Sequence, residues 1–211
     1  MSREVHVRFC EGLGVKFPRA TRPVIHATSQ AQAEQVLEAV RRRLKECGLE
    51  LHPEKTRIVY CQDDDRRGTH SHTTFDFLGY TFRPRRAKNR WRKLFVSFLP
   101  AVSNKAAKEI RATIRSWRFG ATRNNQSLEE IAQFVNPYVR GWVNYYGRFY
   151  RSAMTPVLRQ LERVLVYWAR RKYKRFRRHQ RKATHWLGRI ARRDPELFHA
   201  WRIGIRPATG Q

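Results

Sequence analysis

The sequence has few cysteines and no long apolar run. Its 211 residues include three cysteines, Cys10, Cys47 and Cys61, and no Cys-x-x-Cys pair. So small a number excludes a disulfide-stapled secreted fold and favours a reducing compartment. No apolar run approaches the ~20 residues that a membrane-spanning helix needs, and the first residues show no signal-peptide pattern. We therefore expect a cytoplasmic protein without a membrane partner.

Acidic residues are also scarce, and their shortage is confined to one part of the chain. Over the whole sequence 45 Lys and Arg face 17 Asp and Glu, which gives a formal charge of +28. Residues 1–82 hold 13 basic and 11 acidic side chains, whereas residues 83–211 hold 32 and 6. The second part therefore predicts a polyanion partner. Arginine predominates there and suits phosphate contacts and base stacking, so nucleic acid is favoured over a membrane surface.

The apolar content is nevertheless that of a folded protein. Hydrophobic residues make up 41% of the sequence and aromatic residues 12%, which excludes a disordered basic tail. In the first half the pattern predicts a helix over residues 30–47 that ends at Gly48. It predicts short strands at 5–9, 24–25, 49–51, 56–61, 75–82 and 94–99. The last two strands are expected to form a hairpin whose tip, PRRAKNRWRK, is cationic.

Helical patterns dominate from residue 103 onward. The segment 104–118 carries an apolar and a basic stripe, both at helical spacing. The apolar stripe comprises Ala107, Ile110, Ile114 and Trp117, and the basic stripe comprises Lys108, Arg111, Arg115 and Arg118. A basic stripe is either a solvated face or a track for phosphate groups. Because this one has only Glu109 beside it, phosphate binding is the favoured interpretation.

Residues 127–150, SLEEIAQFVNPYVRGWVNYYGRFY, combine a helix start with closely spaced aromatic and arginine residues. Ser127 and Glu130 predict a capped helix, and Asn136-Pro137 is expected to end or kink it before a new helix begins at Tyr138. We expect the aromatic side chains to lie chiefly in the core of a helical bundle. Arg140, Arg148 and Arg151 are expected to contact nucleic acid.

The densest basic run is residues 169–182, ARRKYKRFRRHQRK, in which nine Lys and Arg are interleaved with Tyr173 and Phe176. It follows a predicted helix that starts at Pro156. Basic and aromatic residues mixed in this way are typical of nucleic-acid-binding segments. The candidate binding residues of this run are Arg170, Arg171, Lys172, Lys174 and Arg175.

One loop carries residues that could suggest a metal site. Asp63, Asp64 and Asp65 are consecutive, and Cys61, His70 and His72 lie nearby. Zinc usually takes four converging ligands, and the spacings typical of such sites are missing. Beside Arg66 and Arg67, the aspartates are more simply a solvated turn, so we expect no metal site.

Four segments in this order and spacing resemble the C-terminal half of bacterial group II intron-encoded proteins, which are reverse transcriptases that also act as maturases. The segments are SQAQAEQVLEAVRRRLKECGLELHPEKTRIVYC, FDFLGYTFRPR, VSNKAAKEIRATIRSWR and NPYVRGWVNYYGRFY. The resemblance runs from about Ser29 to about Trp201 and implies an α+β fold. Residues 29–100 would be the end of a polymerase palm, with a helix, short antiparallel strands and the primer-grip hairpin. Residues 101–177 would be the helical thumb, or maturase-specific X domain, and residues 178–211 a basic helix and tail. Residues 1–28 match poorly.

The resemblance implies roles for particular residues. Phe77, Leu78, Gly79 and Tyr80 correspond to the primer grip. Lys55 corresponds to a palm lysine near the incoming nucleotide, although by itself it could be a surface lysine of a turn. The X-domain signature comprises Asn136, Pro137, Arg140, Gly141, Trp142, Asn144 and Tyr145, each of which either touches RNA or shapes the bundle. The predicted RNA-binding residues are Lys108, Arg111, Arg115, Arg118, Arg140, Arg148, Arg151, Arg170, Arg171, Lys172, Lys174 and Arg175.

The chain departs from the family at the polymerase centre. Reverse transcriptases hold two Mg²⁺ ions with palm aspartates, two of which lie in a Tyr-Ala-Asp-Asp motif. The corresponding residues are Arg19-Ala20-Thr21-Arg22, so a threonine and an arginine replace both aspartates. Mg²⁺ would be expected for the complete family enzyme, but we expect no cofactor and no polymerase activity in this chain alone. The poor match of residues 1–22 suggests a truncated or frameshifted reading frame.

We therefore predict a maturase that binds structured RNA, namely a group II intron, and assists its folding and splicing. DNA at an insertion site is a further candidate partner. Three alternatives stay open: a reverse transcriptase completed by an upstream fragment, an inert truncated product, and a general basic DNA-binding protein.

Overall fold

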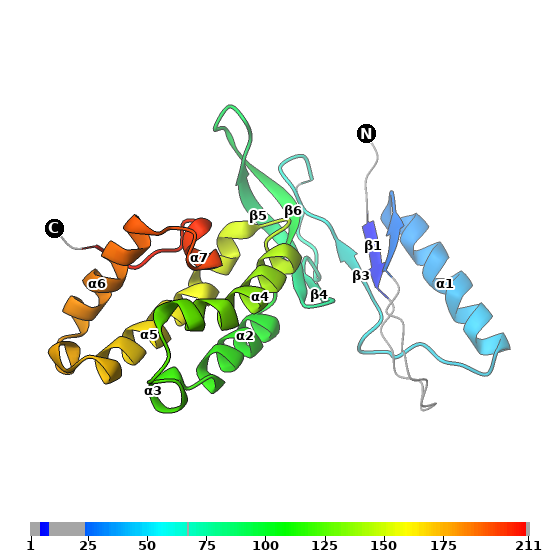
Figure 1. Cartoon of the computed structure of the whole chain (residues 1–211). Coiled ribbons are helices and arrows are strands. Elements are labelled where there is room, and N and C mark those ends of the chain that lie inside the picture. Colours follow the sequence, from blue (N-terminus) through cyan, green and yellow to red (C-terminus); the bar gives the residue numbers. More distant parts are fainter. Residues whose placement is uncertain (1–4, 9–23, 67, 210–211) are drawn as a thin grey trace. The chain divides into compact units, whose positions relative to one another are not determined.

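A computed structural model describes residues 5–8, 24–66 and 68–209 (Figure 1). The chain divides into two compact units, Met1–Pro100 and Ala101–Gln211. Helices and antiparallel strands occur together, which confirms the α+β class. The Arg19–Arg22 segment, where the polymerase aspartates are missing, lies outside the described residues.

The first unit begins with a sheet and a helix. Strands β1 (Val5–Arg8), β2 (Val24–Ala27) and β3 (Arg57–Tyr60) form an antiparallel sheet in the order β2-β1-β3. Helix α1 (Gln30–Glu46) lies along this sheet (Figure 1) and matches the predicted helix closely. Its Ala33 is fully buried against Ala27, because the apolar face of the helix covers the sheet.

Residues 49–51 are not a strand, contrary to the sequence prediction. They complete the end of α1 instead. Gly48 has a positive φ of 70°, its N–H donates to the Lys45 carbonyl at 3.0 Å, and the Leu49 N–H donates to the Leu44 carbonyl at 2.9 Å. These two bonds form a Schellman motif, which satisfies carbonyls that the helix end leaves without partners. The apolar character of Leu49 and Leu51 therefore reflects helix capping and packing, not strand pairing.

The second sheet comprises β4 (Phe75–Phe77), β5 (Tyr80–Lys88) and β6 (Leu94–Val102) in the order β4-β5-β6. The predicted single strand over residues 75–82 is wrong, because Leu78 and Gly79 form a tight turn with φ of 47° and 79°. Two successive positive φ values are typical of a two-residue hairpin turn, and glycine adopts such values without strain. The turn brings Phe75 opposite Phe82, with ring centroids 4.7 Å apart.

The predicted basic hairpin is formed by β5 and β6. Its tip is ordered by Asn89, whose side-chain oxygen accepts from the backbone N–H groups of Trp91 and Lys93, both at 2.9 Å. Trp91 is 70% exposed, and the Arg90 guanidinium lies 4.0 Å from its ring centroid. A cation over an aromatic ring stabilises this exposed arrangement.

The second unit is a helical bundle that follows β6. Its helices are α2 (Asn104–Ser116), α3 (Phe119–Thr122), α4 (Leu128–Tyr146), α5 (Thr155–Lys172), α6 (Gln180–Arg193) and α7 (His199–Arg202). Single 3-10 turns, η1 (Arg151–Met154) and η2 (Lys174–Phe176), flank α5. Helix α5 is central and contacts α2, α3 and α6 (Figure 1). Its Leu158, Leu161, Leu165 and Trp168 are buried in the core of the bundle.

Helix α4 runs through Pro137 without a break, so the predicted second helix from Tyr138 is wrong. Ser127 and Glu130 form the predicted capping box at its start. Ile131, Val135 and Val139 are fully buried on one face that passes the proline. An interior proline destabilises a helix by ~3 kcal/mol, and the packing of α4 on both sides of Pro137 outweighs this cost.

The aromatic residues of α4 also differ from the prediction. None of those between Phe134 and Tyr150 is buried. Phe134, Trp142 and Tyr146 pack on the edge of the core, whereas Tyr138 is 46% and Phe149 54% exposed. The buried face is filled by small and branched aliphatic side chains, which leaves the larger rings on its flanks.

Candidate nucleic-acid interface

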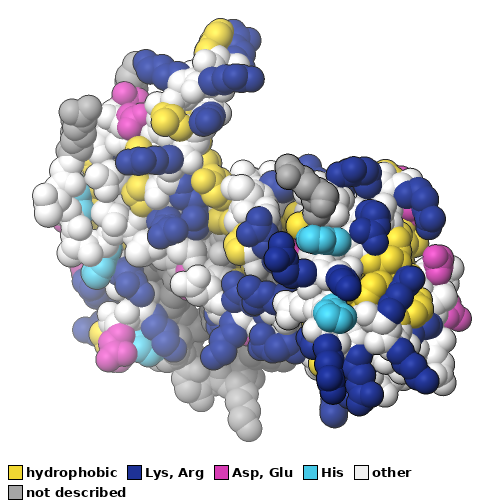
Figure 2. All heavy atoms as spheres, turned by 90° about the vertical axis from the view of Figure 1, so that its left-hand side faces the viewer, with side chains coloured by type: hydrophobic (Ala, Val, Ile, Leu, Met, Phe, Trp, Pro, Cys, Tyr) yellow, Lys and Arg dark blue, Asp and Glu magenta, His cyan; other side chains and the backbone are white. Residues whose placement is uncertain are grey.

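The basic stripe of α2 is presented to solvent. Its apolar counterpart is placed as predicted, with Ala107, Ile110 and Ile114 buried. On the other face Lys108 and Arg115 are exposed and Arg111 is half-buried. Arg118, predicted to continue the stripe, lies beyond the end of α2 at Ser116 and is also exposed. Among the described residues of the second unit, one ion pair is found, between Arg202 and Glu196 at 3.8 Å. Figure 2 shows a face on which Lys and Arg side chains are numerous and acidic ones sparse. The cationic charge of this unit is therefore available to an external anion.

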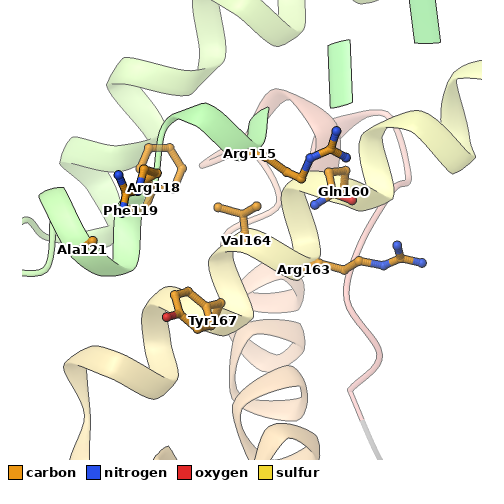
Figure 3. A pocket seen from close by; sticks show the side chains of 8 residues that line it. All are labelled: Arg115, Arg118, Phe119, Ala121, Gln160, Arg163, Val164 and Tyr167. Atoms are coloured by element: carbon orange, nitrogen blue, oxygen red, sulfur yellow. The ribbon is translucent and has the colours of Figure 1, made fainter. Parts of the chain in front are cut away.

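Part of the stripe borders a pocket between α2, α3 and α5 (Figure 3). The pocket has a volume of about 340 Å³. Arg115 and Arg118 contribute cations from the α2 side, and α5 contributes Arg163. Its other lining residues are Phe119, Ala121, Gln160, Val164 and Tyr167. Guanidinium groups, an amide and a half-exposed tyrosine ring are the groups that contact phosphates and bases.

The local chain conformation explains how this pocket forms. Arg118 has a left-handed backbone (φ 46°, ψ 38°) between α2 and α3. This conformation turns the chain so that the next residue, Phe119, is fully buried and its ring lies 5.5 Å from that of Trp117. The Arg118 side chain stays exposed. On α5, residues 160, 163, 164 and 167 share one face because they are three to four positions apart.

A second pocket, of about 490 Å³, lies between the end of α4 and α7. Two of the predicted arginines, Arg148 and Arg151, line it together with Arg202. Its other lining residues are Val143, Asn144, Gly147, His199 and Ile203. His199 and Arg202 are not among the residues predicted from the sequence, because they lie outside the basic stripe and the dense basic run.

Asn136, part of the X-domain signature, holds the segment that forms one wall of this pocket. Its side-chain amide donates to the Leu197 carbonyl at 2.9 Å, and its side-chain oxygen accepts from the His199 N–H at 2.8 Å. Both bonds cross more than sixty residues of chain. Asn136 therefore shapes the bundle by joining α4 to the start of α7.

His199 is 6% exposed and is surrounded by cations. Burial lowers its pKa, the positive charges of Arg202, Arg140 and Arg151 lower it further, and Glu196 acts in the opposite direction. The Arg202 guanidinium lies 3.1 Å from Nδ1. Since a guanidinium can only donate, Nδ1 accepts and the imidazole proton resides on Nε2. Nε2 is buried and has no hydrogen-bond partner in the protein.

The basic run after Trp168 has mixed roles. Arg171, Lys174 and Arg175 are exposed, whereas Arg170 and Lys172 are half-buried. Lys172 donates to the backbone carbonyls of Gln126 and Asn125, so it joins α5 to the loop before α4. Arg170 donates to the Arg177 carbonyl at 3.3 Å. Arg170 and Lys172 thus form hydrogen bonds within the protein, whereas Arg171, Lys174 and Arg175 are exposed to solvent.

Other predicted site residues lie in the first unit. Lys55 lies in the turn before β3, Gly79 occupies the β4–β5 turn, and Tyr80 is buried. Phe77 is half-buried and Leu78 is exposed. Their proposed roles in polymerisation stay predictions.

The aspartates of the 63–65 loop stabilise that loop. Asp64 accepts from the Val96 N–H at 2.9 Å, and Asp63 pairs with Arg66 at 3.6 Å. In the described ranges, no three Asp, Glu, His or Cys side chains gather in a way that could hold a metal.

The bundle is a cationic helical domain with arginine-lined pockets at two of its helix junctions. Residues 107–186, from α2 into α6, match the group II intron, maturase-specific domain. The chain thus carries the maturase-specific domain of group II intron-encoded proteins at these positions, as the sequence resemblance indicated. Comparison with curated proteins and with solved structures gave no significant match. Within the described ranges, no helix has the length and apolarity needed to cross a membrane.

Proposed function

We propose that this protein binds group II intron RNA and assists its folding and splicing. The observation that carries the proposal is the match of residues 107–186 to the maturase-specific domain, over the helices that bear the unpaired cations. Duplex RNA is recognised largely through its shape and backbone. A rigid bundle with exposed arginines is suited to that mode of recognition.

The mechanism we infer is electrostatic. Lys108 and Arg115 on α2, and Arg118 just after it, would neutralise RNA phosphates and release the counterions condensed on them. The packed core keeps these side chains in fixed register, so they would favour one fold of the RNA. The splicing chemistry would belong to the RNA itself, and the protein would supply positioning.

We propose that the first unit is the remnant of a reverse-transcriptase palm, with α1, the antiparallel strands and the Leu78-Gly79 turn as its support. Residues 21 and 22 do not fit a Mg²⁺ site, because neither Thr nor Arg provides a carboxylate. We therefore derive no polymerase step for this chain. Primer extension with and without an upstream palm fragment distinguishes this proposal from a polymerase that such a fragment completes.

The proposal is tested by filter binding of the purified chain to folded intron RNA. If ~6–10 phosphates are contacted, affinity should fall about 10³–10⁵-fold between 50 and 200 mM salt. Duplex DNA of equal length serves as competitor and should displace the RNA only weakly. Salt-independent binding, or equal competition by the DNA, would contradict a maturase function.

Gly120→Ala tests the role of Tyr167 in the first pocket. A Cβ at position 120 would lie 2.6 Å from a Tyr167 ring carbon and 3.1 Å from Arg171 Cγ. Tyr167 is half exposed and can swing away, so the melting temperature should change little. Intron RNA affinity should fall several-fold, since a base–aromatic stack contributes ~1–3 kcal/mol. Gly141→Ala, whose Cβ would meet no atom within 4 Å, controls for the effect of a Gly→Ala change on the melting temperature. An affinity equal to that of the unchanged protein would show that the Tyr167 position is unimportant.

A further inference from the structure

The second pocket, between the end of α4 and α7, gathers positive charge in one place. Three guanidinium groups, those of Arg148, Arg151 and Arg202, line one cavity although their positive charges repel one another. Arg148 and Arg151 have no acidic partner among the described residues, and the Glu196 carboxylate approaches Arg202 at 3.8 Å. Like charges converging on a cavity are stabilised when an anion enters it.

The buried imidazole is the second independent observation. His199 is more than nine-tenths buried, and its protonated Nε2 lacks a partner. A buried donor without an acceptor destabilises the protein. The ring cannot easily turn away, because Asn136 holds its backbone and Arg202 contacts Nδ1. His199 lines the pocket, so an anion bound there would lie beside the imidazole ring.

We propose that the pocket formed by Asn144, Arg148, Arg151, His199 and Arg202 binds one phosphate group of the RNA backbone. This inference rests on the proposed function and identifies a discrete anion site within it. Arginine forks donate to phosphate oxygens, and the Asn144 amide can add a further donor. Such a site would fix the register of the RNA on the bundle, whereas the exposed α2 stripe would contribute general attraction.

The groups around His199 also give the site a dependence on pH. Facing the imidazole are Arg202, Arg140 and Arg151, all positive, together with Glu196 and the neutral Asn136. In the free protein the cations disfavour an imidazolium. A bound phosphate brings negative charge, so by linkage the pKa of His199 should rise on binding.

The experiment is an NMR titration of the full chain, following the side-chain resonances of His199 as inorganic phosphate is added. We expect a saturable shift and a raised pKa of His199. Arg148→Gln/Arg151→Gln should weaken phosphate binding about tenfold or more, since two guanidinium groups that would donate to the phosphate are lost. Arg189→Gln/Arg193→Gln removes the same charge from exposed positions of α6 and should leave the titration unchanged. A short intron RNA should produce the same His199 shift and compete with phosphate.

The outcomes separate this inference from the proposed function. If no saturable His199 shift occurs, or if both double variants titrate alike, the pocket is not a phosphate site, even where filter binding shows salt-dependent RNA affinity. If phosphate binds but the RNA neither shifts His199 nor competes, the assignment to RNA is wrong. If the whole chain does not bind RNA, the proposed maturase function is wrong, and so is the assignment of the pocket to RNA.

Discussion

Arg115→Glu/Arg118→Glu/Arg163→Glu is expected to lower the affinity for intron RNA about 100-fold or more at physiological salt. The three side chains line one pocket, so the change removes up to three phosphate contacts and adds local repulsion. Each lost contact should reduce the slope of log K against log salt by ~0.9, or about 3 units in all. Filter binding at several salt concentrations measures both the affinity and the slope.

The matched control for this variant is Arg41→Glu/Arg42→Glu/Arg43→Glu. It makes the same change in net charge on exposed residues of α1, within residues 1–82, where basic and acidic side chains nearly balance. We expect a loss of only a few-fold there, from the weaker long-range attraction. Circular dichroism should verify that both proteins are folded. Equal losses would show that net charge, and not the position of the arginines, determines binding.

Asn136→Ala is expected to lower the free energy of unfolding by about 2–4 kcal/mol. The substitution removes two hydrogen bonds and leaves the Leu197 carbonyl and the His199 N–H without their partner in a half-buried region. The melting temperature of the chain should fall by roughly 5–15 °C. Thermal unfolding followed by circular dichroism provides the measurement.

Two further variants test the explanation for Asn136. Asn144→Ala changes an exposed asparagine on the same helix and should alter stability by no more than ~0.5 kcal/mol. Asn136→Asp keeps the acceptor for His199 but loses the donor to Leu197, so its stability should be intermediate. If Asn136→Ala melts at the temperature of Asn144→Ala, the link between α4 and α7 does not contribute to stability.

Local patterns in the sequence predicted much of the helical structure. Ser29 and Gly48 bound α1 because capping depends on residues within one turn of the helix end. The buried stripe of α2 follows equally from helical periodicity. Two predictions were wrong for different reasons. At Pro137 tertiary packing outweighed the local preference against helix, and at Leu78-Gly79 the local pattern was ambiguous. Core packing on both sides of Pro137 keeps α4 continuous, and an aromatic run could not distinguish one strand from two strands joined by a two-residue turn.

By itself the sequence determined the charge asymmetry, the capped and amphipathic helices and the maturase-specific segment. These properties reside in composition and in short-range order. Only the tertiary structure decided which basic side chains share a cavity and which are engaged internally, as Lys172 is. The phosphate pocket is the clearest case, because it depends on Asn136 holding residues 197 and 199 against α4. No pattern of neighbouring residues encodes a contact across sixty positions, since the packing of the whole bundle produces it.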